Sequence, residues 1–239
     1  VTGPVTFVLT AARLVTVRHH APRPFETFAA RADRSSTGCE TPPRLFLGLV
    51  EEIVARLADH LEGASRSLDA LAARVYAGSG GAGATLDAAA LGEALRAIGR
   101  DGEVLGRVRL GLLTVERMLS VWGLWSDESG KGGGLRTHVK TLLRDIQALE
   151  VHADFLAGRV SLASDTTLGL VNLQQNQAVR ILSVVAVLFL PPTLIGTVYG
   201  MNFAQMPELD RWWGYPAALV LMVVSALLCW AWFRWRGWL

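Results

Sequence analysis

The most regular hydrophobic pattern of the chain lies in its second half, where apolar positions recur at alternating spacings of four and three. Five heptads of this kind are typical of a coiled-coil seam. The seam positions are Leu135, Val139, Leu142, Ile146, Leu149, Ala153, Leu156, Val160, Ala163, Thr167 and Leu170. The pattern predicts one long helix that packs this stripe against other helices.

Two shorter helical patterns precede the seam, and glycine-rich breakers separate the three. The first begins at Pro43 and ends at residues 78–83, and the second spans about 85 to 125 with a soft point near residues 99–102. We interpret residues 41–134 as a cytosolic helical hairpin. Together with the seam helix it forms an antiparallel bundle.

The N-terminal region contains two runs rich in β-branched residues, Thr6–Leu9 and Arg13–Arg18, which predict a hairpin. Two strands alone are only marginally stable. We therefore interpret residues 1–40, in which a short helix and a loop follow the hairpin, as the remnant of a cytosolic α/β domain. Because the chain begins at Val1 and not at Met, we expect it to lack its true start.

Two uncharged runs near the C-terminus, residues 181–199 and 214–233, are each long enough to cross a bilayer. A buried core helix is the alternative, but flanking tryptophans and arginines favour a membrane hairpin. Arg180 precedes the first run, and Arg234 and Arg236 follow the second. The positive-inside rule places both termini in the cytoplasm.

These boundaries give a mainly α fold, a helical stalk with two C-terminal transmembrane helices. The long helix covers residues 135–199, an extracytoplasmic loop covers 200–213, the second span covers 214–234, and a cytosolic tail covers 235–239. We expect a multi-pass protein of the plasma (inner) membrane, with the lipid bilayer as one of its partners.

Composition and motifs exclude several classes of function. Only 18% of the 239 residues are charged and the net charge is +2, and no basic patch with interleaved aromatics predicts nucleic-acid binding. The sequence contains no hydrolase triad, zinc-protease motif or phosphate-binding loop, so we expect neither an enzyme nor an organic cofactor. The five histidines are scattered, and we assign them structural or surface roles.

The end of the first span carries the most informative motif, Tyr199-Gly200-Met201-Asn202-Phe203, followed by Met-Pro-Glu-Leu at 206–209. Gln175-Asn176-Gln177 precedes the span, and Pro192-Thr193-Leu194 lies within it. In this order the motifs resemble the CorA family of magnesium and cobalt transporters. The resemblance covers residues 135–239 specifically and the earlier part less specifically.

The resemblance implies a homopentameric channel that admits Mg²⁺, and also Co²⁺ or Ni²⁺, down its electrochemical gradient. Gly200, Met201 and Asn202 form its ion entrance, where amide oxygens hold the hydrated ion, since Mg²⁺ gives up water reluctantly. We expect Glu208 and Asp210 in the loop to concentrate cations near the mouth.

One face of the long helix lines the pore in this interpretation, and its apolar members form a constriction that closes by dewetting. Helix packing is the alternative role for these residues. The pore-lining positions are Asp165, Asn176, Val179, Leu182, Ala186, Leu190, Thr193 and Thr197.

The sequence departs from the family in the missing first half of the α/β domain and in Thr197, where glycine often occurs. CorA channels are closed by intracellular Mg²⁺, and Asp145, Glu150 and Asp154 are candidate regulatory ligands. Two alternatives remain: a zinc transporter of the same fold, and a membrane-anchored coiled-coil scaffold or sensor, which does not need Asn202.

Overall fold

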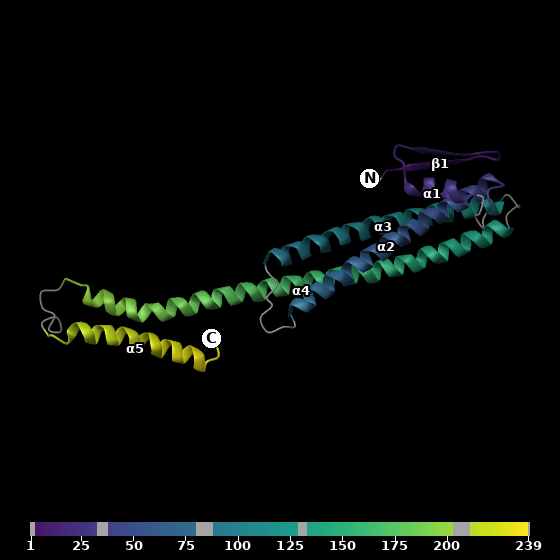
Figure 1. Ribbon diagram of the computed structural model, residues 1–239. Coiled ribbons are helices and arrows are strands. Elements are labelled where there is room, and N and C mark those ends of the chain that lie inside the picture. Colours follow the sequence, from purple (N-terminus) through teal and green to yellow (C-terminus); the bar gives the residue numbers. More distant parts are fainter. Residues whose placement is uncertain (1–2, 33–37, 80–87, 129–132, 203–210, 239) are drawn as a thin grey trace. The chain divides into compact units, whose positions relative to one another are not determined.

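The computed structural model describes residues 3–32, 38–79, 88–128, 133–202 and 211–238 (Figure 1). The chain divides into two compact units. The first contains Val1–Thr167 and the second Leu168–Leu239. Each unit is considered separately below.

An antiparallel hairpin begins the first unit and confirms the predicted one. Strand β1 (Val5–Leu9) pairs with β2 (Leu14–Arg18), with Val5 opposite Arg18 and Leu9 opposite Leu14. The turn is closed by the Thr10 N–H, which donates to the Arg13 carbonyl at 2.9 Å. A short helix, α1 (Arg23–Arg31), follows the hairpin.

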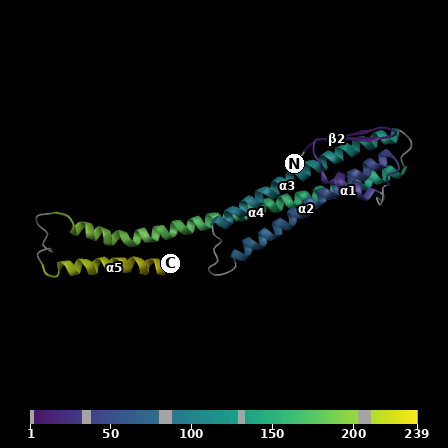
Figure 2. The same cartoon turned by 45° about the horizontal axis from the view of Figure 1, so that its top comes forward.

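Three long helices form the rest of the first unit: α2 (Pro42–Ser79), α3 (Ala88–Glu128) and the first part of α4 (Gly133–Tyr199). They lie side by side in both views (Figures 1 and 2). Helix α3 runs through residues 99–102, where we expected a soft point. The two glycines there cost only about 1 kcal/mol each, and buried leucine and isoleucine side chains on both sides hold the helix in place.

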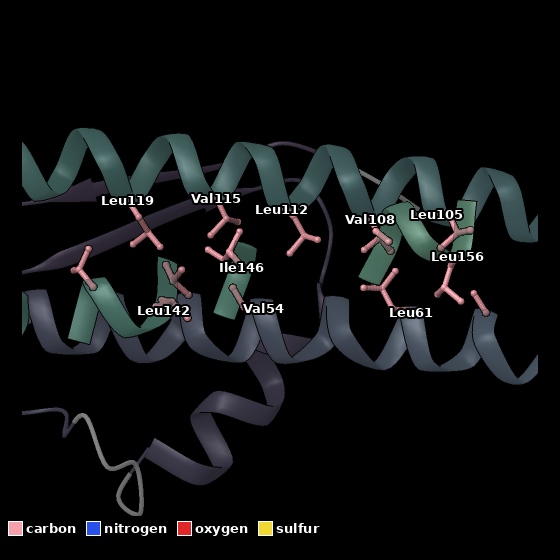
Figure 3. Packing of buried hydrophobic residues seen from close by; sticks show 14 of the residues in the cluster. Val54, Leu61, Leu105, Val108, Leu112, Val115, Leu119, Leu142, Ile146 and Leu156 are labelled. Atoms are coloured by element: carbon pink, nitrogen blue, oxygen red, sulfur yellow. The ribbon is translucent and has the colours of Figure 1, made fainter. Parts of the chain in front are cut away.

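The core of this unit lies between the three helices, and the seam of α4 contributes to it as predicted. Val139, Leu142, Ile146, Ala153 and Leu156 are all buried. Figure 3 shows leucines and valines of α3 facing α2 and α4 in successive layers. The 4-3 spacing therefore marks the side of α4 that contacts the other helices.

Aromatic side chains join the hairpin to the bundle. The Phe7 ring lies 5.4 Å from that of Phe46 on α2, in an edge-on arrangement, and Phe46 lies 5.6 Å from Trp122 on α3. Such pairs stabilise beyond the area that they bury, by about 0.5–1.5 kcal/mol. The hairpin is thus attached to the helices through side-chain packing.

The second unit is a pair of apolar helices, the last part of α4 and α5 (Gly214–Trp235). Both are long and apolar enough to cross a membrane, and only 6% and 11% of their apolar windows are buried. A core helix of a soluble protein would be mostly covered. The exposure of these apolar side chains therefore favours a lipid environment over a protein core.

Candidate functional site

The candidate ion entrance begins where α4 ends. The Gly200 N–H donates to the Gly196 carbonyl at 3.0 Å, which completes the last helical turn. A Cβ atom at position 200 would lie 3.1 Å from that same carbonyl oxygen, so a side chain here would crowd the helix end. Met201 and Asn202 follow outside the helix and are both exposed. An exposed amide at the end of a span can contact a hydrated cation through its oxygen.

The predicted pore-lining residues of the second unit are all exposed and share one face of α4. Leucine and valine exposure there is high, at 71% for Leu182, 65% for Leu190 and 58% for Val179. The remaining members of this pore face are Asn176, Ala186, Thr193 and Thr197. The second unit therefore leaves the whole pore face uncovered.

The opposite face of α4 contacts α5. Val184 is buried, with 7% of its surface exposed. A Cβ atom at Gly196 would lie 3.4 Å from the Met222 Cε of α5, so the two helices approach closely at this glycine. On α5, Ala218 and Phe233 are buried. Since α5 covers one side of α4, the pore face is free for other contacts.

Two hydroxyl groups on the pore face present acceptor oxygens. Thr193 Oγ1 donates to the Phe189 carbonyl at 2.7 Å, and Thr197 Oγ1 donates to the Thr193 carbonyl at 2.8 Å. Each hydroxyl has one hydrogen and two lone pairs. Because the hydrogen is used within the helix, the lone pairs remain available to accept from the water of a hydrated ion.

Two consecutive prolines interrupt the hydrogen-bond ladder of the span. Pro191 and Pro192 have no N–H, so the carbonyls of Val187 and Leu188 lack their usual helical donors. The helix nevertheless continues to Tyr199. The span therefore contains two backbone acceptors that the helix itself does not satisfy.

Three other predicted site residues remain. Asp165 is exposed on α4 in the first unit. Glu208 and Asp210 fall outside the described residues, so their position relative to Asn202 stays a prediction.

The candidate regulatory carboxylates lie on the part of α4 that belongs to the first unit. Asp145 is exposed, and Asp154 forms an ion pair with Arg109 of α3 at 2.9 Å. Burial raises the pKa of Glu150, and the nearby charge of Glu116 raises it further. Within the described residues, no three carboxylate, histidine or cysteine side chains are grouped closely enough to hold a metal ion. Within the described part of one chain, Asp145, Glu150 and Asp154 therefore do not form a three-ligand metal site.

The sequence interpretation missed one group of residues. His20 and His60, which we assigned structural or surface roles, line a single cavity together with Arg23 and Arg56. No motif spacing indicates this group, because the hairpin and α2 bring it together from distant parts of the chain.

Comparison with known proteins identifies the family. The profile described as "CorA-like Mg2+ transporter protein" matches residues 1–235. The magnesium transport protein CorA of Escherichia coli (strain K12) is 32% identical over 235 residues, which are 98% of this chain and 71% of that protein. The chain belongs to the CorA-like Mg²⁺ transporter family.

Other CorA proteins and solved structures agree with this. The CorA of Salmonella typhimurium (strain LT2) is 31% identical over the same shares of the two chains. The CorA magnesium transporter of Methanocaldococcus jannaschii superposes with a TM-score of 0.72 at 20% identity, over 95% of this chain and 68% of that one. The full-length CmaX protein gives a TM-score of 0.60 at 18% identity, over 96% and 67%. The chain thus has the CorA fold, as its sequence motifs predicted.

Proposed function

We propose that this chain is one subunit of a homopentameric CorA channel that carries Mg²⁺ into the cytoplasm, and that also admits Co²⁺ or Ni²⁺. One observation supports the channel most directly. The pore face of α4, which leads up to the turn at Gly200–Asn202, is among the faces that α5 leaves uncovered. Five copies placed around an axis can bring these faces together without displacing α5.

The entrance is a ring of Asn202 amides, one from each subunit. An amide oxygen accepts hydrogen bonds from the waters of a hydrated Mg²⁺, which holds its six waters tightly. The ion therefore enters with most of its water. The carboxylates of Glu208 and Asp210 raise the cation concentration near this ring.

Below the ring, the pore face alternates between polar and apolar positions. The free lone pairs of Thr197 and Thr193 accept from the ion's water. The Leu190, Leu182 and Val179 side chains form apolar constrictions that exclude water when the pore is closed. Asn176 and Asp165 then provide oxygen atoms on the cytoplasmic side, and the ion leaves past them.

The direction of transport follows from charge. Arg180, Arg234 and Arg236 flank the two spans on one side, which the positive-inside rule places in the cytoplasm of the inner membrane. Arg234 and Arg236 lie over the rings of Trp230 and Trp232, at 5.4 and 5.5 Å, as in interfacial belts. An inside-negative potential drives influx with about 2.3 kcal/mol per charge per 100 mV, and a divalent ion gains twice that.

Cytosolic Mg²⁺ also regulates the channel in this proposal. Asp145, Glu150 and Asp154 are candidate ligands, and a site would need carboxylates from more than one subunit. Within the described residues, one chain does not gather three such ligands.

The proposal is tested by substituting Asn202→Ala and measuring Mg²⁺ uptake into vesicles that contain the purified protein. We expect a loss of about tenfold or more, since a hydrogen bond to a charged partner contributes about 1.5–3 kcal/mol. Gln147→Ala removes an exposed amide from the cytosolic part of the same helix and serves as the matched control. We expect its uptake to be unchanged.

Unchanged uptake in the Asn202→Ala protein, or no uptake in the parent, would favour the scaffold over the channel. The same vesicles loaded with Co²⁺, Ni²⁺ or Zn²⁺ indicators define the ion selectivity. Transport of Zn²⁺ without Mg²⁺ would identify a zinc transporter of the same fold.

A further inference from the structure

A cavity of about 650 Å³ lies in the first unit between the end of the hairpin, the start of α1 and the side of α2. Its volume is within the range of about 300–1,000 Å³ that is usual for small-molecule sites. Four of its lining residues are titratable, and all four are basic: His20, Arg23, Arg56 and His60. The cavity lies outside the spans and outside the proposed ion path.

The local structure explains why these side chains converge. Arg56 and His60 are four residues apart on α2, so both project from the same side of that helix. Arg23 is the first residue of α1, where the helix dipole adds partial positive charge. Arg18 lies nearby as well, 4.5 Å above the ring of Phe25, which also lines the cavity.

Few carboxylates offset this positive charge. Arg56 contacts Asp59 at 3.4 Å, and this carboxylate is 65% exposed. The Nδ1 atom of His20 is buried against Gly3, so the edge of this imidazole that faces the cavity is the other one.

The other walls of the cavity are apolar. Val5 and Phe25 contribute from the hairpin and α1, and Ile53 and Leu57 contribute from α2. A ligand that fits must therefore combine an anionic group with an apolar or ring-shaped body. A bare divalent cation does not fit, because arginines repel it.

The geometry points to a binding site for an organic phosphate of nucleotide type, a function that is independent of the proposed ion path. Arginine guanidinium groups match phosphate oxygens in a bidentate arrangement, and histidine nitrogens add donors. The apolar wall formed by Val5, Phe25, Ile53 and Leu57 packs against the body of the ligand.

The test is a calorimetric titration of the detergent-purified chain with ATP, both with and without Mg²⁺. We expect saturable binding, and about tenfold weaker binding for Arg56→Gln or Arg23→Gln, since each loses a charge-assisted contact. Arg66→Gln is the matched control, because Arg66 lies ten residues further along α2 and has a similar exposed ion pair, with Glu62 at 3.9 Å. This variant should bind ATP as the parent does.

A fourth variant should change affinity in the opposite direction. Asp59→Asn removes the carboxylate that occupies Arg56, so we expect tighter ATP binding by several-fold. Tripolyphosphate should bind about tenfold more weakly than ATP, and adenosine should not bind measurably, because each lacks one of the two required parts.

Several results would overturn the assignment. These are no binding of ATP to the parent chain, equal binding of ATP and tripolyphosphate, or full binding by the Arg23→Gln/Arg56→Gln double variant. Thermal unfolding of each variant, followed by circular dichroism, establishes that a loss of binding is not a loss of fold. A failure here leaves the Asn202 uptake test unaffected, because the two sites share no residue.

Discussion

At the scale of single residues, Glu150 is the described side chain whose pKa clearly departs from its ordinary value. Its Oε1 atom is buried and has no hydrogen-bond partner among the described residues. Burial is the main cause that raises its pKa; the charges of Glu116 and Asp154 act in the same direction, and Arg109 opposes them. A carboxyl whose pKa is higher in the folded than in the unfolded chain destabilises the fold once it ionises. Stability therefore falls as pH rises through the raised pKa.

Glu150→Gln removes this penalty. We expect a higher thermal midpoint at neutral pH, from a gain of less than about 1 kcal/mol because the side chain is only partly buried. The gain should vanish below the ordinary pKa of glutamate, where the parent carboxyl is neutral in both states. Unfolding of the purified protein across a pH series measures this.

The control for this prediction is Glu62→Gln, which changes an exposed carboxylate on α2. Its effect on stability should stay within about 0.5 kcal/mol at every pH. A gain from Glu150→Gln that does not depend on pH would show that packing, and not charge, is responsible.

At the scale of secondary-structure elements, two neighbouring leucines on α3 allow the stability contribution of a buried side chain to be compared with that of an exposed one. Leu112 is fully buried between the helices (Figure 3). Leu113, the next residue, is 47% exposed. Leu112→Ala should lower the free energy of unfolding by about 2–5 kcal/mol, through lost transfer free energy and a residual cavity. Leu113→Ala should change it by less than about 0.5 kcal/mol.

Thermal or denaturant unfolding of the two variants in detergent checks this pair. Equal effects would mean that the Leu113 side chain is covered in the assembled protein, and that α3 takes part in contacts between subunits.

The elements were predictable to different degrees. The seam of α4 follows from its spacing, because a helix that buries one side needs apolar residues at that period. The contact of Phe7 with Phe46, and of Phe46 with Trp122, was not predictable, since it joins positions far apart in the chain. The side of α4 that contacts α5 was also not predictable from the sequence. An apolar span has no polar face, so its periodicity does not show which side a neighbour covers.

The candidate site was predictable only in part. The motif at Gly200–Asn202 indicated a candidate entrance by its resemblance to a family, and this role stays a prediction. Helical spacing grouped Thr193 with Thr197 on one face. The cavity lined by His20 and Arg56 could not be predicted from the sequence, because its residues come from the hairpin region and from α2. Convergence of this kind depends on tertiary packing.

At the scale of the whole molecule, the uncovered pore face predicts where copies of the chain meet. Leu190→Cys, in a protein with Cys39 and Cys229 replaced by serine, should form disulfide-linked dimers on mild oxidation. Val184→Cys is the matched control, because Val184 is buried on the side of α5 and should stay reduced. Electrophoresis without reducing agent distinguishes the two.

The number of subunits in the oligomer is determined by measuring the mass of the detergent-solubilised complex. A homopentamer has about five times the 25.8 kDa of one chain, apart from bound detergent and lipid.

The cross-linking experiment can also contradict the pore assignment. Cross-linking of Val184→Cys in preference to Leu190→Cys would place the other face of α4 between the copies, and the pore assignment would be wrong.

The proline pair in the span limits where such a pore can become dry. The carbonyl oxygens of Val187 and Leu188 are held at membrane depth without helical donors, and hydrocarbon offers none. They need water or a donor from a neighbouring helix, in the closed state as much as in the open one. Access of water or of such a donor to the outer half of the span is then a standing requirement of the backbone. Where water supplies it, we expect the dry constriction of the proposed channel nearer the cytoplasm, at Leu182 and Val179, rather than at Leu190 beside the prolines.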